Sequence, residues 1–171
     1  VQAGNDEILK KMKRKYSVDE FKDIVKKFRQ AIPEITIATD VICGFPGETK
    51  EQFQDTVNLI NEIKPEVMNI SRFWSRPKTS AQKLFPLSGR ETKERSRKIT
   101  DIFDWILFET NKKWRNWQGE IIIDEKGRDN QWIGRNSSYK PVIVTGNYHL
   151  GEKLNVRVEL VTKYDLRAVE I

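Results

Sequence analysis

The stretch best suited to binding a ligand is a glycine-rich turn that follows a short apolar segment. Residues 35–43 are β-branched and mostly apolar, which predicts a buried parallel strand, and they lead into Gly44-Phe45-Pro46-Gly47-Glu48. In a parallel α/β sheet, ligands bind at the carboxyl ends of the strands, and glycines let the backbone approach them closely. The simpler interpretation is a tight turn that only starts the next helix, with Thr49 as its N-cap.

A second candidate ligand site follows the next predicted strand, at residues 67–74. The stretch 69–79 carries Arg72, Arg76 and Lys78. Guanidinium groups match the geometry of carboxylates and phosphates, which favours binding of an anionic group there. The alternative is a solvated basic loop, because exposed charges often have no partner of consequence.

A third candidate lies near the C-terminus, where aromatic residues alternate with cations. The stretch 132–141 contains Trp132, Arg135, Tyr139 and Lys140. Aromatic rings stack on bases and cations pair with phosphates, so this pattern is typical of RNA binding. It is also compatible with a small core in which Trp132 and Tyr139 simply pack.

The chain has one cysteine and one histidine, Cys43 and His149. It can form no internal disulfide, and it lacks the set of ligands that a structural zinc site needs. We expect Cys43 to be buried in packing and His149 to lie on the surface of a turn. This usage fits a reducing compartment, and we expect a cytoplasmic protein.

The elements that position these residues alternate between helix and strand in the first part of the chain. Apolar spacing predicts helices at residues 6–12, from Ser17 to Pro33 and from Thr49 to Pro65. The two strands lie after the second and third of these helices. A loop at residues 75–89 and a long charged helix at residues 91–114 follow. This order predicts an α/β fold with a parallel sheet.

The pattern changes after Gly119. Short alternating or β-branched runs separated by turns predict strands at residues 120–125, 131–133, 139–145 and 153–161. Such spacing indicates a small all-β barrel. We therefore expect two domains, residues 1–114 and 115–171, with the boundary near 113–118.

Net charge and hydropathy bear on two function classes, nucleic-acid binding and membrane spanning. Lysine and arginine number 31 against 25 aspartate and glutamate residues, a net charge of +6, which permits nucleic-acid binding without requiring it. No apolar run approaches the ~20 residues that a membrane-spanning helix needs, so a membrane span is excluded. The first residue is Val1 and no charged-then-apolar leader follows, so we expect a fragment or a processed chain.

Several stretches occur in the order and spacing of the radical-SAM methylthiotransferases. They are residues 1–6, 9–16, 38–49 and 75–81, with Gly134-Arg135-Asn136 and Tyr139-Lys140-Pro141-Val142 in the tail. The chain resembles the C-terminal half of these enzymes, and its tail resembles the RNA-binding TRAM domain that ends them. Within the family it looks most like the archaeal and eukaryotic branch.

The resemblance implies a fold, an activity and its cofactors. The fold would be the C-terminal part of a partial (β/α) radical-SAM barrel followed by a small TRAM β-barrel. The full-length protein would add a 2-methylthio group to N6-threonylcarbamoyladenosine beside the tRNA anticodon, using S-adenosylmethionine and two 4Fe-4S clusters. Clusters need several cysteine thiolates. We therefore expect their ligands in a missing N-terminal part of the same protein, and we expect this fragment alone to be inactive.

The resemblance also implies site residues by motif match. The S-adenosylmethionine site would include Gln2, Asn5, Arg14, Asp40, Gly44, Pro46, Gly47 and Glu48. Arg76 and Thr79 would contact substrate, and the RNA contacts would be Trp132, Arg135, Tyr139 and Lys140. We expect tRNA rather than DNA as partner, and no catalytic or metal-binding residue in this chain. Ala3 and Asn5 replace the usual serines of the family, and Lys78 stands where glycine is usual.

Other functions remain open from the sequence. One is an RNA-binding module in which the α/β part is only a scaffold. Another is a methylthiotransferase of the same superfamily that modifies an aspartate of a ribosomal protein. A third, an unrelated α/β hydrolase or transferase, would need an acid–base constellation that the sequence does not contain.

Overall fold

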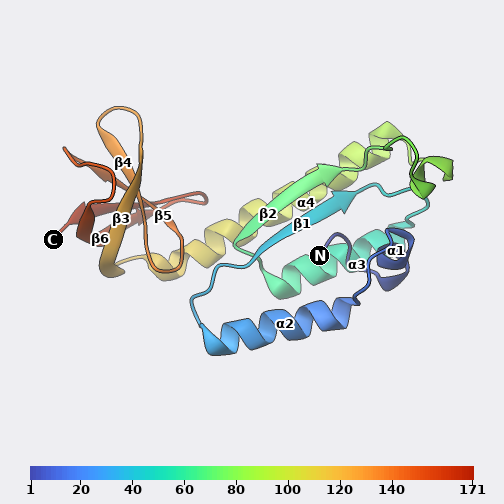
Figure 1. Ribbon diagram of the computed structural model, residues 1–171, viewed down its shortest axis with the longest axis horizontal. Coiled ribbons are helices and arrows are strands. Elements are labelled where there is room, and N and C mark those ends of the chain that lie inside the picture. The colour runs from blue at the N-terminus through green and yellow to red at the C-terminus, as the bar shows by residue number, and fades with distance from the viewer. The chain divides into compact units, whose positions relative to one another are not determined.

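The computed structural model describes residues 1–171, which form two compact units (Figure 1). The first unit is Val1–Phe103 and the second is Asp104–Ile171. The division falls inside the long helix α4, Gly89–Asn111. The domain boundary near residues 113–118 therefore stays a prediction. No helix is long and apolar enough to cross a membrane.

Three helices of the first unit begin where the sequence predicts them, and each begins at a side-chain cap. α1, Asp6–Lys11, is capped by the Asn5 side chain. α2, Val18–Ala31, and α3, Lys50–Ile63, each begin with a complete capping box, Ser17 with Glu20 and Thr49 with Gln52. In these boxes the side chains satisfy N–H groups that have no partner inside the helix.

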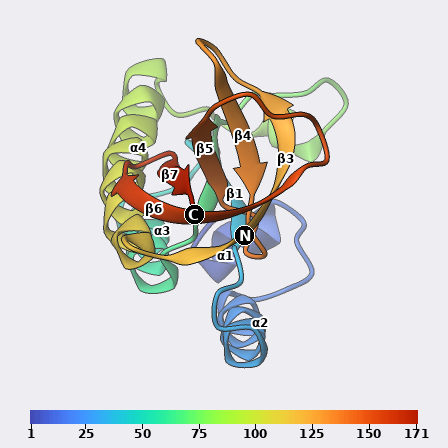
Figure 2. The same ribbon diagram turned by 90° about the vertical axis from the view of Figure 1, so that its left-hand side faces the viewer.

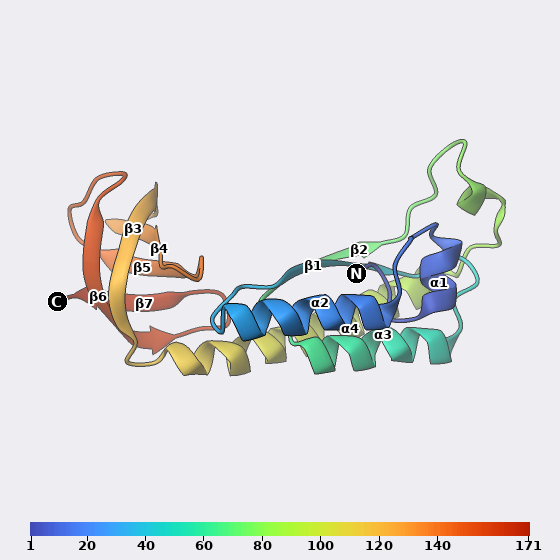
Figure 3. The same cartoon turned by 60° about the horizontal axis from the view of Figure 1, so that its bottom comes forward.

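A two-stranded parallel sheet joins these helices. β1, Ala38–Cys43, pairs in parallel with β2, Val67–Arg72, in a register that sets Ala38 opposite Val67. Figure 3 shows α2, α3 and the start of α4 along one side of the strands. The parallel pairing is confirmed. Full burial of the first strand is wrong, because only alternate residues of β1 face the helices, which leaves Asp40 exposed.

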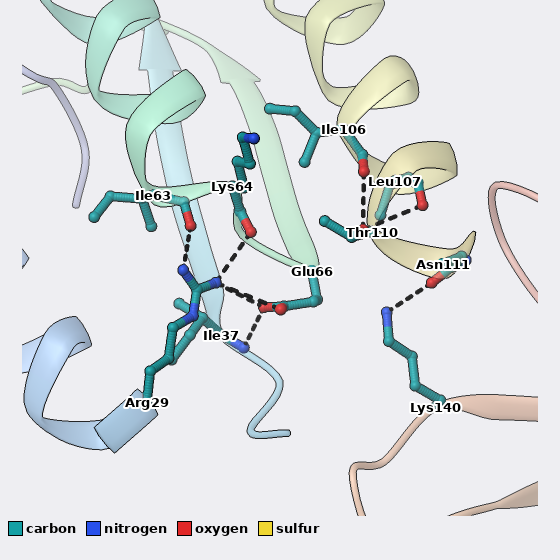
Figure 4. Close-up of polar contacts among 10 residues, drawn as sticks. All are labelled: Arg29, Ile37, Ile63, Lys64, Glu66, Ile106, Leu107, Thr110, Asn111 and Lys140. Carbon is teal, nitrogen blue, oxygen red and sulfur yellow. Dashed lines mark hydrogen bonds and ion pairs between the residues drawn. The ribbon is translucent and has the colours of Figure 1, made fainter. Parts of the chain in front are cut away.

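An arginine ties the end of α2 to the end of α3 (Figure 4). Arg29 donates hydrogen bonds to the carbonyl oxygens of Ile63 and Lys64, at 2.5 and 3.1 Å. Its guanidinium also lies 3.3 Å from the Glu66 carboxylate, which accepts the Ile37 N–H at 2.9 Å. The last carbonyls of α3 and the start of β2 are therefore held by one side chain.

A long connection follows β2. It contains a short 3₁₀ turn, η1, at Ser80–Lys83, and it ends where α4 begins. The expected long helix is confirmed, and a further 3₁₀ turn, η2, extends it over Lys112–Trp114.

The second unit is a closed five-stranded barrel in the order β3-β4-β5-β7-β6 (Figure 2). Its strands are Gln118–Lys126, Gln131–Arg135, Pro141–Thr145, Lys153–Val161 and Leu166–Glu170, for β3 to β7. The predicted barrel is confirmed. The last strand, β7, is missing from the sequence prediction. It closes the barrel by pairing in parallel with β5 and antiparallel with β6.

The barrel core consists of apolar side chains from every strand and the preceding turn. The fully buried members include Trp114, Ile121, Val142, Val156 and Leu166. Trp114 packs edge-on against Trp117, with ring centroids 5.7 Å apart. The turn after α4 is therefore part of this unit.

Candidate functional site

A cavity of about 810 Å³ in the first unit opens at the carboxyl ends of β1 and β2. This is where an α/β sheet binds its ligands. Residues predicted for the site that line this cavity are Gln2, Arg14, Asp40, Arg76 and Thr79. Motifs far apart in the sequence thus converge on one cavity.

Two polar groups of the cavity are held in place by hydrogen bonds. The Tyr16 hydroxyl donates to Gln2 Oε1 at 2.6 Å, and the Ile42 N–H donates to the Gln2 carbonyl at 3.0 Å. Asn69 Nδ2 donates to Asp40 Oδ1 at 2.9 Å. An amide and a carboxylate are therefore presented in fixed orientations.

Aromatic rings form the apolar part of the cavity. Phe45 and Phe73 pack edge to face, with centroids 5.2 Å apart, and Trp74 follows them along the wall. The Phe73 N–H donates to the Cys43 carbonyl at 2.8 Å, so the chain continues beside β1 past the end of β2. Aromatic walls with a few oriented polar groups are typical of sites for small organic ligands.

The loop beyond β2 brings cations to the same cavity. Thr79 Oγ1 donates to the Arg76 carbonyl at 2.8 Å, and the Lys78 N–H donates to Gln82 Oε1 at 3.1 Å. Lys78 has a φ of +64°, in the left-handed region that favours glycine. The lysine therefore adopts the backbone conformation suited to the glycine that the resemblance leads us to expect there.

The other predicted cofactor residues do not line this cavity. Asn5 caps α1 and donates to Asp55 Oδ2 at 2.8 Å. Gly44, Pro46, Gly47 and Glu48 lie outside the lining as well. A Cβ on Gly44 would come within 2.5 Å of Thr92 Oγ1, so this turn is packed against α4.

Glu48 is buried in an ion pair that the sequence does not indicate. Arg95 Nη1 lies 2.5 Å from Glu48 Oε2, and its Nη2 contacts the Glu48 carbonyl at 3.1 Å and Glu91 Oε1 at 2.5 Å. Burial raises the pKa of Glu48, and the Arg95 guanidinium offsets part of this effect. The Glu48 carboxylate thus binds Arg95 of α4 and holds the turn between β1 and α3 against that helix.

Cys43 is buried beside this pair. Burial raises the pKa of its thiol to about 12, so the sulfur stays protonated near neutral pH. A protonated, buried thiol is a poor nucleophile and a poor metal ligand. The expectation that Cys43 serves packing is confirmed, and His149 lies on the surface with its side chain 80% exposed.

The described residues fit one of the two implied cofactors, S-adenosylmethionine, and not the other, an iron–sulfur cluster. No group of three or more His, Cys, Asp or Glu side chains could hold a metal ion, and Cys43 is the only thiol. These residues therefore do not fit an iron–sulfur cluster. The cavity beyond β1 and β2 does fit S-adenosylmethionine, because it combines aromatic walls with Asp40 and several arginines.

In the second unit, Arg135 and Tyr139 form an exposed cation–aromatic pair. The guanidinium carbon lies 4.9 Å from the Tyr139 ring centroid, and the tyrosine is 69% exposed. Arg135 Nε also contacts Asp124 Oδ2 at 3.1 Å. Asn136 Oδ1 accepts the N–H groups of Ser138 and Lys140, which shapes the turn that presents the ring.

The other two predicted RNA contacts are not at the surface. Trp132 is part of the barrel core, with the Lys126 ammonium 5.5 Å from its ring centroid. Lys140 is buried, and its Nζ donates to Asn111 Oδ1 at 3.0 Å (Figure 4). Trp132 therefore stabilises the barrel by apolar packing. Lys140 stabilises it through the hydrogen bond to Asn111, since a buried ammonium needs polar partners.

The structure also brings forward residues that sequence reasoning missed. Arg95 lies at helical spacing among other charges, so nothing in the sequence sets it apart. Phe45, Phe73 and Trp74 adjoin strand ends, and this position is a signal for the cavity wall. Lys163 and Tyr164 form a second cation–aromatic pair in the barrel, and their adjacency in the sequence could have indicated it.

Two family models match separate parts of the chain. Residues 1–60 match the Radical SAM superfamily, and residues 119–169 match the TRAM domain. The chain therefore joins a radical-SAM segment to a TRAM domain.

Curated relatives carry names of tRNA-modifying enzymes. A probable threonylcarbamoyladenosine tRNA methylthiotransferase of Methanothermobacter thermautotrophicus is 41% identical over 84% of this chain and 34% of its own length. The threonylcarbamoyladenosine tRNA methylthiotransferase of Drosophila melanogaster is 33% identical over 97% of this chain and 30% of its own length. A tRNA-2-methylthio-N(6)-dimethylallyladenosine synthase of Methylacidiphilum infernorum is 38% identical over 92% of this chain and 35% of its own length.

The chain is thus similar to proteins with tRNA methylthiotransferase and related synthase names, and it spans about a third of the length of these relatives. The resemblance stated from the motifs is confirmed at the level of both domains and of the homologues.

Proposed function

We propose that this chain is part of a tRNA methylthiotransferase that adds a 2-methylthio group to N6-threonylcarbamoyladenosine. The observation that carries the proposal is the convergence of Gln2, Arg14, Asp40, Arg76 and Thr79 on one cavity at the strand ends. The printed names of the relatives supply the reaction. A tRNA substrate favours a cytoplasmic location.

Within this proposal the cavity of the first unit holds S-adenosylmethionine and part of the substrate. Bound S-adenosylmethionine supplies the radical chemistry that gives the superfamily its name. The aromatic rings of the lining would pack on the adenine ring, Asp40 would pair with a cationic group, and Arg76 would pair with a carboxylate. The threonyl group of threonylcarbamoyladenosine and the methionine part of the cofactor both carry such a carboxylate. The two implied clusters would take their thiolates from outside residues 1–171.

The barrel contributes tRNA binding through Arg135 and Tyr139. The exposed tyrosine ring offers a surface on which a base can stack, and the guanidinium offers charge for a phosphate. Trp132 and Lys140 act indirectly, by holding the strands and the turn that present this pair.

The activity is tested in the full-length protein that contains this chain. Nucleosides of tRNA from cells that depend on this protein are analysed by mass spectrometry for the 2-methylthio form of threonylcarbamoyladenosine. Asp40→Asn should lower the modified fraction at least tenfold, whereas Asp101→Asn, an exposed carboxylate of α4 outside the cavity, should leave it unchanged. Equal activity of both variants would argue against the cavity as the cofactor site.

The same nucleoside analysis separates two tRNA products, and mass spectrometry of ribosomal proteins tests the protein-modifying alternative. The relative from Methylacidiphilum infernorum is named for dimethylallyladenosine, so the 2-methylthio form of that nucleoside is the second candidate product. A modified aspartate in ribosomal protein, with unmodified tRNA, would instead identify the protein-modifying branch of the superfamily. Binding of tRNA without any methylthio product would leave only an RNA-binding module.

A further inference from the structure

A second exposed cation–aromatic pair lies in the turn between β6 and β7. The Lys163 ammonium is 4.5 Å from the Tyr164 ring centroid, and Tyr164 is 61% exposed. The pair repeats the arrangement of Arg135 and Tyr139, where a cation also lies over an exposed tyrosine ring. The Tyr164 hydroxyl donates to Asp104 Oδ1 at 3.5 Å, so the hydroxyl is anchored to α4 while most of the ring stays exposed.

The turn that carries Tyr164 is fixed in shape by hydrogen bonds of its own. Thr162 Oγ1 accepts the N–H groups of Tyr164 and Asp165, at 3.1 and 3.0 Å. The Lys163 ammonium contacts Asp104 Oδ2 at 2.8 Å, and this hydrogen bond raises the pKa of Lys163. The ring is thus presented by a preorganised turn, which lowers the entropy that a ligand must offset on binding.

One buried side chain links this turn to the turn of Tyr139. Asn111 Nδ2 donates to the carbonyls of Thr162 and Lys163, at 2.9 and 3.2 Å. Its Oδ1 accepts a hydrogen bond from Lys140, the residue after Tyr139. Asn111 is therefore hydrogen-bonded both to the turn that carries Tyr164 and to the residue that follows Tyr139.

We propose that Tyr164 is a second base-stacking site, which binds a further unpaired nucleotide of the tRNA that Tyr139 contacts. This inference rests on the proposed function. Asp104 balances the charge of Lys163, so the ring rather than the ammonium supplies the contact. Stacking on an aromatic face accepts any base, which suits a site that holds a loop without reading its sequence.

The inference is tested by measuring tRNA binding to this chain by fluorescence anisotropy at several salt concentrations. Tyr164→Leu should weaken binding by about 5- to 150-fold, the range for loss of one stacked base. Tyr164→Phe should bind like the parent chain, because stacking needs the ring and not the hydroxyl. The dependence of affinity on salt should not change, since no phosphate contact is removed.

His149→Leu is the matched control, because it also replaces an exposed ring in a barrel turn. Circular dichroism confirms that each variant is folded. If Tyr139→Leu weakens binding and Tyr164→Leu does not, the second site is refuted while the proposed function stands. If the parent chain does not bind tRNA, or Tyr139→Leu has no effect, the proposed RNA site itself fails.

Discussion

A buried carboxylate needs a cation beside it, and Glu48 obtains one from Arg95, which lies 47 positions further along the chain. Both side chains are almost completely buried, at 1% and 5% exposure. Two charges taken out of water are stabilised only by good geometry and additional hydrogen bonds. Arg95 meets this condition by also binding the Glu48 carbonyl and Glu91.

Replacing Arg95 should therefore destabilise the first unit strongly. Arg95→Met leaves Glu48 buried without its cation, and we expect a loss of about 3 to 5 kcal/mol in the free energy of unfolding. Arg90→Met is the control, because Arg90 pairs with Glu94 on the surface with its side chain 89% exposed. The control should lose less than about 1 kcal/mol. Urea unfolding measures both, and equal losses would contradict the account.

The pH dependence of the same variant has a definite sign. The pKa of Glu48 is raised in the folded state, so its contribution to stability is greatest below the ordinary carboxyl range and declines as pH rises through the folded pKa. Without Arg95 this pKa rises further, because the guanidinium is what lowers it. The stability deficit of Arg95→Met should shrink between about pH 7 and about pH 5. Urea titrations of both chains at each pH would show this, and a constant deficit would contradict it.

The sequence predicts which segments line the cavity, but it does not predict the direction of each side chain in those segments. Gln2, Asp40 and Arg76 follow from motifs placed at strand ends. Glu48 belongs to the same motif, yet its direction depends on Arg95. A partner so distant in sequence leaves no local pattern, so the burial of Glu48 could not be predicted.

At the scale of elements, the turn between β1 and α3 depends on two glycines with positive φ. Gly44 has a φ of +81° and Gly47 a φ of +75°. A side chain at Gly44 would meet Thr92 of α4, whereas the space around Gly47 is open. A side chain is therefore disfavoured by the positive φ at both Gly44 and Gly47, and at Gly44 also by the contact with Thr92.

Alanine substitutions should separate these two effects. Gly47→Ala should cost about 1 to 2 kcal/mol of stability, for an alanine in a left-handed conformation. Gly44→Ala should cost clearly more, because its Cβ would lie 2.5 Å from Thr92 Oγ1. Thermal unfolding of the two variants gives the comparison. Equal destabilisation would mean that α4 does not restrict this turn.

Local sequence signals predict where the helices start, but they predict the bounds and number of the barrel strands less well. The starts of α2 and α3 are predicted correctly, because their capping boxes depend on residues only three positions apart. β5 begins at Pro141 rather than at residue 139, because Tyr139 has a φ of +62° and belongs to the turn. β7 is short and follows directly on β6, and its pairing with β5 is not encoded locally.

At the scale of the whole molecule, the order of the domains was predictable, because each has its own periodicity and its own motifs. The cation that we propose as an RNA contact is harder to predict from the sequence, since the barrel contains many charges paired with each other. Arg135 and Lys163 share one feature, because each pairs with an aspartate and also lies over an exposed tyrosine ring. The Arg135–Asp124 pair depends on the antiparallel pairing of β3 with β4.

Arg135→Ala should weaken tRNA binding and reduce its dependence on salt. Loss of one phosphate contact lowers the slope of log affinity against log salt by about 0.7 to 0.9. Arg157→Ala is the matched control, because Arg157 is also a strand arginine of the barrel paired with a carboxylate, Glu159. Filter binding at low and moderate salt measures both. An unchanged slope for Arg135→Ala would remove this residue from the RNA interface.

Asn111 gives the barrel a property that neither of its turns has alone. The Asn111 amide binds the backbone of the Thr162–Lys163 turn and the ammonium of Lys140, next to Tyr139. A displacement of either turn should therefore shift Asn111 and, through it, the other turn. Substitutions at Tyr139 and Tyr164 should therefore show thermodynamic coupling, so that a double variant departs from the sum of the single ones. Over evolutionary time, the two aromatic positions would be expected to change together or not at all.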